Sequence, residues 1–312
     1  MIKMKKNNDE IEQNDVDREI VGNEELQRDF RQYANSTKTI ENYGGNHIKK
    51  IKDVQLEKYN FQNLTLKECS IEDSEIKYSY ICDKSYLRHT RFKNVDFTGT
   101  IFENVNLQKA SFENCLLNYV RFENCIIDYE NILKSKPYQP NLALFLIKSL
   151  YKNELQQGNT KKADELLLLL KKEERELYKS FLGWRKEKES NDVLYQNVNY
   201  YNEEMERRKL SKKCVFFKLM LSYINDIVWG YGIKVSKIFR FMCCCIFIFA
   251  GVYLWILDQS IFEAFFLSAN SWILNSTSTD NLIVDFFILI ENYLGLVSFA
   301  LYTSALYRKV EK

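Results

Sequence analysis

The sequence predicts a mixed fold in three successive parts: a repeat domain, a set of α-helices and a C-terminal membrane domain. Three observations carry this prediction. Apolar residues recur every five positions from about residue 51, the chain's two prolines follow at Pro137 and Pro140, and two long apolar runs fill the last quarter. A chain of 312 residues is long enough for two or three domains.

The N-terminal segment, residues 1–48, is polar and has no sustained hydrophobic period. We therefore expect a disordered or loosely helical tail, in which a short helix over 24–34 is an option. No apolar h-region of a secretory signal lies at the N-terminus, so the N-terminal body is expected to stay in the cytoplasm.

The repeat domain is predicted over residues 51–135. Its central positions are apolar and five residues apart, with a one-residue slip between Ile81 and Leu87. Neither an α-helix nor a flat strand has a period of five. The central residues are Phe61, Leu66, Ile71, Ile76, Ile81, Leu87, Phe92, Phe97, Phe102, Leu107, Phe112, Leu117, Phe122, Ile127 and Ile132. Small or compact side chains stand two positions before many of them: Cys69, Ser74, Ser79, Thr90, Val95, Thr100, Val105, Ala110, Cys115, Val120 and Cys125.

This pattern resembles the pentapeptide-repeat family, whose chain winds as a right-handed quadrilateral β-helix with both positions pointing inward. Four repeats to a coil stack residues twenty apart. The stacked interior pairs would be Phe92 and Phe112, Phe102 and Phe122, and Leu107 and Ile127. On the outside, Asn94 with Asn114 and Asn104 with Asn124 would form amide ladders.

Some pentapeptide β-helices mimic duplex DNA, which requires a strongly acidic face. Between Ile51 and Ile132 there are thirteen acidic and ten basic residues. This near-neutral balance, with a net charge of +2 for the whole chain, argues against a nucleic-acid partner. A spacer, or a docking surface for an unidentified cytoplasmic protein, is the expected role.

The eight cysteines are expected to be reduced thiols of a cytoplasmic body. There is no CxxC pair in the repeat domain and the chain has two histidines, so we predict no metal site and no cofactor. Without a Gly-rich phosphate loop, a GxSxG or an HExxH motif, the chain is not expected to be an enzyme. Residues 243–245, three consecutive cysteines, are interpreted as apolar filler of a membrane helix, with reversible acylation as the alternative.

A helical hairpin linker is predicted over 140–210. Helical spacing runs from Asn141 to Gln156, a turn follows at 157–159, and a second helix begins at Lys161. Residues 211–236 combine lysines with apolar side chains, as in an amphipathic helix at the inner membrane surface. Gly230-Tyr231-Gly232 (230–232) is interpreted as the turn that leads into the first span.

The membrane domain is predicted over 238–312. Phe241 to Leu257 carries no charge, and a second apolar run extends from Leu282 to Tyr307. Basic residues precede the first run and follow the second, whereas none lies between Asp258 and Tyr307. The positive-inside rule therefore predicts a multi-pass protein of the inner (cytoplasmic) membrane with both termini in the cytoplasm.

The stretch 253–309 resembles the two-helix pore domain of bacterial potassium-channel-like proteins, in which pentapeptide repeats and a helical linker often precede the pore. An outer helix, FFLSANS on a pore helix, and ENYLG and ALYTSALYRK on an inner helix match in order. The resemblance implies a homotetramer that conducts monovalent cations through a pore loop. The family's filter TTxGYGD falls near 273–280, where this chain has ILNSTSTD, with Ser276 and Ser278 in place of both glycines. Potassium selectivity is therefore not predicted.

The predicted ion-pathway residues are Asn275, Ser276, Thr277, Ser278, Thr279, Asp280 and Glu291. Glu291 would either line the pathway or brace the pore helix by a hydrogen bond. Gly295 would serve as an inner-helix hinge or as a close-packing position. The favoured function is a poorly selective cation channel with a cytoplasmic regulatory or docking domain. The alternative is a non-conducting membrane-anchored scaffold, or a membrane effector in a stress or phage-defence system.

Overall fold

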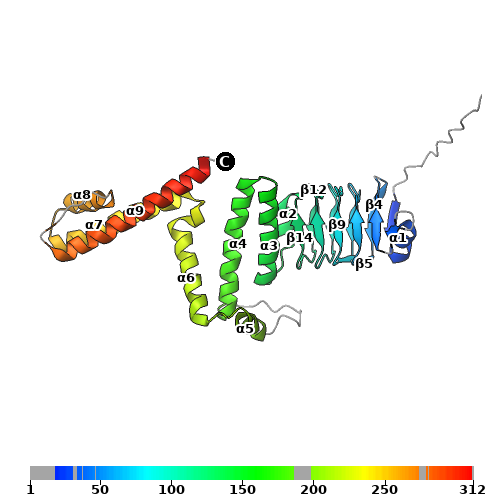
Figure 1. Cartoon of the computed structure of the whole chain (residues 1–312), viewed down its shortest axis with the longest axis horizontal. Coiled ribbons are helices and arrows are strands. Elements are labelled where there is room, and N and C mark those ends of the chain that lie inside the picture. Colours follow the sequence, from blue (N-terminus) through cyan, green and yellow to red (C-terminus); the bar gives the residue numbers. More distant parts are fainter. Residues whose placement is uncertain are drawn as a thin grey trace, which may run out of the picture. The chain divides into compact units, whose positions relative to one another are not determined.

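The computed structural model describes residues 18–30, 34–36, 38–45, 47–185, 198–273, 279 and 281–310. They divide into two compact units, residues 1–163 and residues 164–312. The first unit holds a stack of short strands with helices at its ends, and the second is helical (Figure 1).

The first unit is a β-solenoid in which successive turns pair in parallel. A five-stranded sheet has the order β1-β4-β7-β10-β13, a six-stranded sheet has the order β14-β11-β9-β6-β3-β2, and β5-β8 and β12-β15 form two further pairs. The strands are β1 Arg18–Val21, β2 Ala34–Ser36, β3 Thr39–Glu41, β4 Ile48–Lys52, β5 Gln55–Glu57, β6 Asn60–Gln62, β7 Ser70–Glu72, β8 Glu75–Lys77, β9 Tyr80–Cys82, β10 Arg91–Lys93, β11 Ile101–Glu103, β12 Asn106–Leu107, β13 Ser111–Glu113, β14 Arg121–Glu123 and β15 Ile126–Ile127. The right hand of the winding and its four-sided section stay predictions.

The interior follows the five-residue period. All fifteen predicted central residues and all eleven predicted small residues are buried. Phe92 pairs with Phe112, with ring centroids 4.9 Å apart, and Phe102 pairs with Phe122 at 5.2 Å with rings nearly parallel. Small polar interior residues bond to the backbone, as Thr100 does to the carbonyl oxygen of Ile76 at 2.5 Å. Burying such a hydroxyl without a partner would cost about 1–3 kcal/mol.

The outer amide ladder is confirmed at one predicted pair and wrong at the other. Asn124 donates from Nδ2 to Oδ1 of Asn104 at 2.6 Å. Asn94 instead donates to Oδ1 of Asp73 at 2.7 Å. Asn94 therefore bonds to the preceding coil through a carboxylate, and no bond joins it to Asn114.

The N-terminal tail predicted over residues 1–48 requires a correction. Residues 18–21 form a strand that pairs with β4, residues 23–30 form α1 (Asn23–Phe30), and residues 39–41 form a strand that pairs with β6. Ile20, Leu26 and Ile40 are buried here. The optional short helix over 24–34 corresponds to α1, but no period in the sequence indicates the strands, because each buries only one or two side chains.

The C-terminal end of the solenoid is closed by helices α2 (Tyr129–Leu133) and α3 (Pro140–Gln156). Asn153 accepts from the backbone N–H of Cys125 at 2.7 Å and donates to its carbonyl oxygen at 2.9 Å. Ser149 accepts from the N–H of Phe122 at 2.7 Å. An open strand edge is a template for pairing with another chain, so α3 blocks end-to-end growth of the solenoid.

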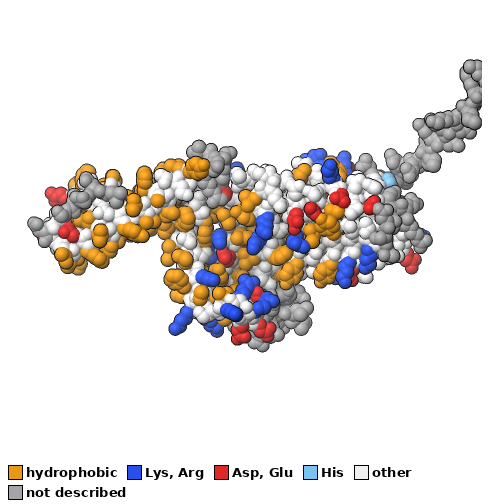
Figure 2. Space-filling view, in the orientation of Figure 1, with side chains coloured by type: hydrophobic (Ala, Val, Ile, Leu, Met, Phe, Trp, Pro, Cys, Tyr) orange, Lys and Arg blue, Asp and Glu red, His pale blue; other side chains and the backbone are white. Residues whose placement is uncertain are grey.

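The second unit is built from helices. Their bounds are α4 Thr160–Phe181, which begins at the boundary between the units, α5 Val198–Arg207, α6 Lys212–Val228, the 3₁₀ turn η1 Gly230–Gly232, α7 Val235–Leu257, α8 Ile261–Trp272 and α9 Leu282–Val310. Helices α7 and α9 are long and apolar enough to span a membrane, with mean hydropathies of 2.1 and 1.8. Only 11% and 28% of these apolar windows are buried, whereas the core helix of a water-soluble protein is mostly buried. Figure 2 shows hydrophobic side chains along both.

Candidate functional site

Helices α7, α8 and α9 pack together, and α8 is the shortest of the three. The chain leaves α7 at Asp258, which has a left-handed φ of 48°, and enters α8 through a capping box. Ser260 accepts from the N–H of Glu263, and the Glu263 carboxylate accepts from the N–H of Ser260. This reciprocal cap satisfies two N–H groups at the start of α8 and fixes where the helix begins.

Glu291 of α9 is fully buried and joins all three helices. The hydroxyl of Tyr253 on α7 donates to Oε2 of Glu291 at 2.7 Å, and the hydroxyl of Ser268 on α8 hydrogen-bonds to Oε1. Ser268 Oγ also lies 3.0 Å from the carbonyl oxygen of Ile246 on α7. A buried carboxyl group is costly unless it is bonded. In this single chain Glu291 therefore braces α8.

Gly295 allows α8 to approach α9 closely. A Cβ atom on Gly295 would lie 2.4 Å from the carbonyl oxygen of Trp272, the last residue of α8. Ser268, Ser271 and Ser298 are also small and buried at these helix faces. Small residues at helix–helix contacts are typical of membrane proteins, where backbones pack without a hydrophobic driving force.

An apolar cluster of α7, α8 and α9 adjoins Glu291 through Tyr253. Tyr253, Ala264, Val284 and Ile288 are buried together. Phe249 packs against them, 6.5 Å from Phe287 between ring centroids. These contacts come from all three helices and fix the position of α8.

The predicted filter lies largely outside the described residues: this applies to Asn275, Ser276, Thr277, Ser278 and Asp280. Thr279 is described. Its N–H and its hydroxyl both donate to Oδ1 of Asp285, at 2.8 and 2.9 Å. Asp285 thus holds the segment that enters α9.

Tyr253, Ser268 and Trp272 were missed as site residues by sequence reasoning. The number of residues that separates them from Glu291 and Gly295 matches no helical period, because these contacts form between different helices after the chain has turned back. A polar residue within an apolar run, such as Ser268 in FFLSANS, is the one signal that could have found part of the network.

A second polar cluster connects the helices on either side of the 3₁₀ turn. Asp226 of α6 pairs with Lys237 of α7 at 2.5 Å and with Arg175 of α4 at 3.1 Å. Arg175 also donates to the hydroxyl of Tyr231 at 2.8 Å. That hydroxyl donates to the carbonyl oxygen of Ser222 at 2.8 Å. Burial opposes ionisation of Asp226, but the hydrogen bond from Lys237 and the nearby positive charges outweigh it and lower the pKa of its carboxyl group.

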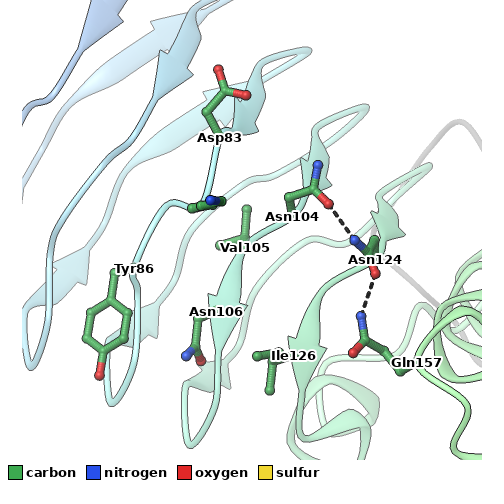
Figure 3. A pocket seen from close by; sticks show the side chains of 9 residues that line it. Asp83, Tyr86, Asn104, Val105, Asn106, Asn124, Ile126 and Gln157 are labelled. Carbon is green, nitrogen blue, oxygen red and sulfur yellow. Dashed lines mark hydrogen bonds between the residues drawn. The ribbon is translucent and has the colours of Figure 1, made fainter.

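The solenoid carries a polar groove of about 750 Å³ (Figure 3). Asn104, Asn124 and Gln157 line it in a row, and Gln157 donates to Oδ1 of Asn124 at 2.7 Å. Asp83 and Lys84 lie at the other side of the groove, where both have a left-handed φ, 54° and 62°. They lie where the repeat has one extra residue, between Ile81 and Leu87. The groove is therefore located at this irregularity of the repeat.

Comparison with known proteins identifies the repeat. Residues 81–127 match the family model described as pentapeptide repeats, in eight copies. None of the curated proteins with which the chain was compared matches it. The chain therefore combines a β-solenoid of pentapeptide repeats with two helices long enough to span a membrane. Among the described residues, no group of three or more His, Cys, Asp or Glu side chains could hold a metal ion.

Proposed function

We propose that this protein is an oligomeric membrane channel for cations, in which the pentapeptide solenoid serves as a cytoplasmic docking or regulatory domain. The observation that carries the proposal is the position of α8. This apolar helix has twelve residues and is therefore about 18 Å long. A bilayer's hydrocarbon core is about 30 Å thick, so α8 is too short to cross it.

A short apolar helix between two spans is the arrangement of a pore helix. The Glu291 network and the close approach at Gly295 hold α8 against both spans. Its carboxyl end, Trp272, leads directly into residues 274–280, which would form the pore loop. The carboxyl end of a helix carries partial negative charge, which favours a cation near that loop.

One copy does not enclose a pore, so the proposal requires an assembly of several copies around an axis, a homotetramer by the resemblance to two-helix pore domains. Large apolar side chains on α8 and α9 are strongly exposed, among them Phe262, Phe266, Leu282 and Leu289. In the proposed assembly these side chains would face lipid or the neighbouring copies.

The serines at 276 and 278 replace the flexible glycines that a ring of backbone carbonyls needs. We therefore propose passage of monovalent cations with little selectivity, through hydroxyl groups and the ring of Asp280 carboxylates. For the solenoid, the groove at Asp83 and Lys84 is the proposed docking surface, since both ends of the solenoid are closed by α1 and α3.

The test is the reversal potential of purified protein in planar bilayers under opposed potassium and sodium gradients. A reversal potential near zero supports a poorly selective cation pathway. As a control, replacing potassium and sodium with an impermeant cation should abolish the inward current. A reversal potential at the potassium limit would overturn the prediction about the filter. Absence of current from folded oligomers would overturn conduction itself.

The second candidate function is a non-conducting anchor that keeps the pore fold and presents the solenoid at the membrane. The sequence contains no glycine between Gly251 and Gly295, and this is the observation that favours it. An anchor in a scaffold or in a stress or phage-defence system would keep the Glu291 brace and pass no current. The same bilayer recording therefore separates the two candidates.

A further inference from the structure

Helix α6 exposes an apolar face, on which Phe216 makes an edge contact with Trp184 and remains 46% exposed. Val215, Leu219 and Ser222 turn toward the protein and are buried. On the other side of the helix, six large apolar side chains are between 37% and 68% exposed: Phe216, Phe217, Met220, Leu221, Ile224 and Ile227. Their spacing of three and four residues places them on one continuous stripe.

The exposed charged residues of α6 are all basic, whereas its one acidic residue, Asp226, is partly buried in ion pairs. Residues 207–225 contain six basic residues and no acidic residue. Lys212 and Lys218 are exposed on either side of the apolar stripe, and Lys213 is exposed at its beginning. Figure 2 shows Lys and Arg side chains at the end of the unit where α6 begins. An apolar stripe bordered by lysines is complementary to a surface that has an apolar interior and a negatively charged outer layer.

The far end of α6 is fastened to the first candidate span. Lys237, in the first turn of α7, donates to both the side chain and the backbone carbonyl oxygen of Asp226, at 2.5 and 2.6 Å. This pairing holds the C-terminal end of α6 close to the first turn of α7. Figure 1 shows α6 crossing the direction of α7 and α9 at a steep angle. A helix that crosses the spans at the start of one of them lies along the membrane surface.

We infer that α6 is a docking helix for an anionic phospholipid surface, with its apolar stripe among the acyl chains and its lysines at the headgroups. The inference rests on the proposed function only in requiring that α7 and α9 cross a membrane; it does not require conduction. A protein partner or a second copy could also cover an apolar stripe. The run of positive charge and the continuity with α7 favour the lipid surface.

The experiment measures the depth of α6 in nanodiscs by spin-label accessibility to oxygen and to a nickel chelate. Single labels are placed on the full chain at Phe217→Cys and Ile227→Cys on the stripe, and at native Cys214 on its rim. Cys243, Cys244 and Cys245 are replaced by alanine in every variant, and Cys214 as well for the stripe labels. The nanodiscs contain phosphatidylcholine alone or with phosphatidylglycerol at three to one.

In the anionic nanodiscs we expect the stripe labels to be accessible to oxygen and shielded from nickel, and the Cys214 label to be accessible to nickel. Replacing Lys212, Lys213 and Lys218 with glutamine should lower the ratio of docked to undocked helix about fivefold per lysine. The matched control, Lys161→Gln with Lys162→Gln on α4, should leave the depth unchanged.

Nickel accessibility of both stripe labels in anionic nanodiscs would overturn the inference. Equal depth of the stripe labels in both lipid compositions would also overturn it, because the anionic headgroups would then have no role. Spin–spin broadening at Phe217→Cys would overturn it as well, because α6 would then lie against a second copy. Labels at Leu254→Cys and Leu289→Cys test the spans separately. If these are also exposed to nickel, membrane insertion itself has failed; if they are deep, only the inference about α6 has failed.

Discussion

The carbonyl oxygen of Trp272 occupies the space that a side chain on Gly295 would need, with a Cβ only 2.4 Å away. Gly295→Ala should therefore push the carboxyl end of α8 away from α9 and lower stability by about 1–3 kcal/mol, the usual cost of overpacking. Thermal unfolding of the purified protein in detergent, followed by circular dichroism, measures this loss.

Gly251 provides a matched control in the neighbouring helix α7. A Cβ on Gly251 meets no atom within 4 Å, so Gly251→Ala should be neutral or stabilising by up to about 1 kcal/mol, since alanine favours the helix. Equal effects of the two substitutions would show that the contact at Trp272 is not what requires glycine at 295.

Glu291→Ala should remove the carboxyl group that bonds to both α7 and α8. Tyr253 would be left with a buried, unpaired hydroxyl group, at a cost of about 1–3 kcal/mol, whereas Ser268 keeps its bond to the carbonyl oxygen of Ile246. Under the channel proposal, this change should also alter single-channel conductance in planar bilayers, as should Thr277→Ala in the filter.

Glu291→Gln is the conservative counterpart. Its amide oxygen can accept from Tyr253, and its amide nitrogen can donate to Ser268, so the fold should be retained. If Glu291→Gln keeps the stability and still changes the conductance, the charge at 291 acts on the ions. Unchanged currents in Glu291→Ala and Thr277→Ala would contradict the assignment of both residues to the pathway.

The cysteines should differ sharply in reactivity. Burial raises the pKa of the Cys69 thiol to about 12, and it raises those of Cys115 and Cys125 to about 11. Cys214 is exposed on α6. Because only the thiolate reacts, a maleimide at pH 7 should label Cys214 in the folded protein in detergent and spare the three interior thiols, as mass spectrometry of tryptic peptides would show.

Unfolding in guanidinium should make all of these thiols reactive. Labelling of Cys115 or Cys125 at the rate of Cys214 in the folded protein would mean that the solenoid opens on the timescale of the reaction.

Asn153→Ala should destabilise the solenoid from its C-terminal end. The substitution leaves the N–H and the carbonyl oxygen of Cys125 without partners, and each buried unpaired group costs about 1–3 kcal/mol. Gln157→Ala, which removes an exposed side-chain bond to Asn124, should cost much less. Hydrogen exchange of β14 and β15 measures the difference, and equal protection in the two variants would refute a capping role of Asn153.

Asp226 should make the contact between α6 and α7 sensitive to acid. The pKa of Asp226 is lower in the folded chain than the ordinary value of 3.8, so its ion pairs contribute stability above about that pH. The contribution is lost as the pH falls through the lowered pKa. In acid titrations of thermal stability, Asp226→Asn should be less stable than the native chain at neutral pH and converge with it below this range.

If the pairs with Arg175 and Lys237 contributed nothing, the two titration curves would coincide at every pH, which would contradict this prediction. Lys179→Gln serves as the control, because Lys179 lies at the edge of the same cluster and pairs with Glu176 rather than with Asp226.

The sequence by itself determined the solenoid interior and the positions of the long helices. Phe102 and Phe122 could be paired in advance because a regular coil converts a fixed sequence distance into a contact. Helices α3, α7 and α9 were predictable because their apolar runs are long. The start of the solenoid was not predictable, since Ile20 and Leu26 are isolated apolar residues in a polar segment.

Only the tertiary structure decided which groups meet across helices that reverse direction. The bonds of Glu291 to Tyr253 and Ser268, the approach of Trp272 to Gly295 and the ion pairs of Asp226 join residues whose separations follow no period. Local sequence patterns record which face of a helix is apolar. They do not record the angle and the register at which two helices pack, because these depend on the shapes of both surfaces together.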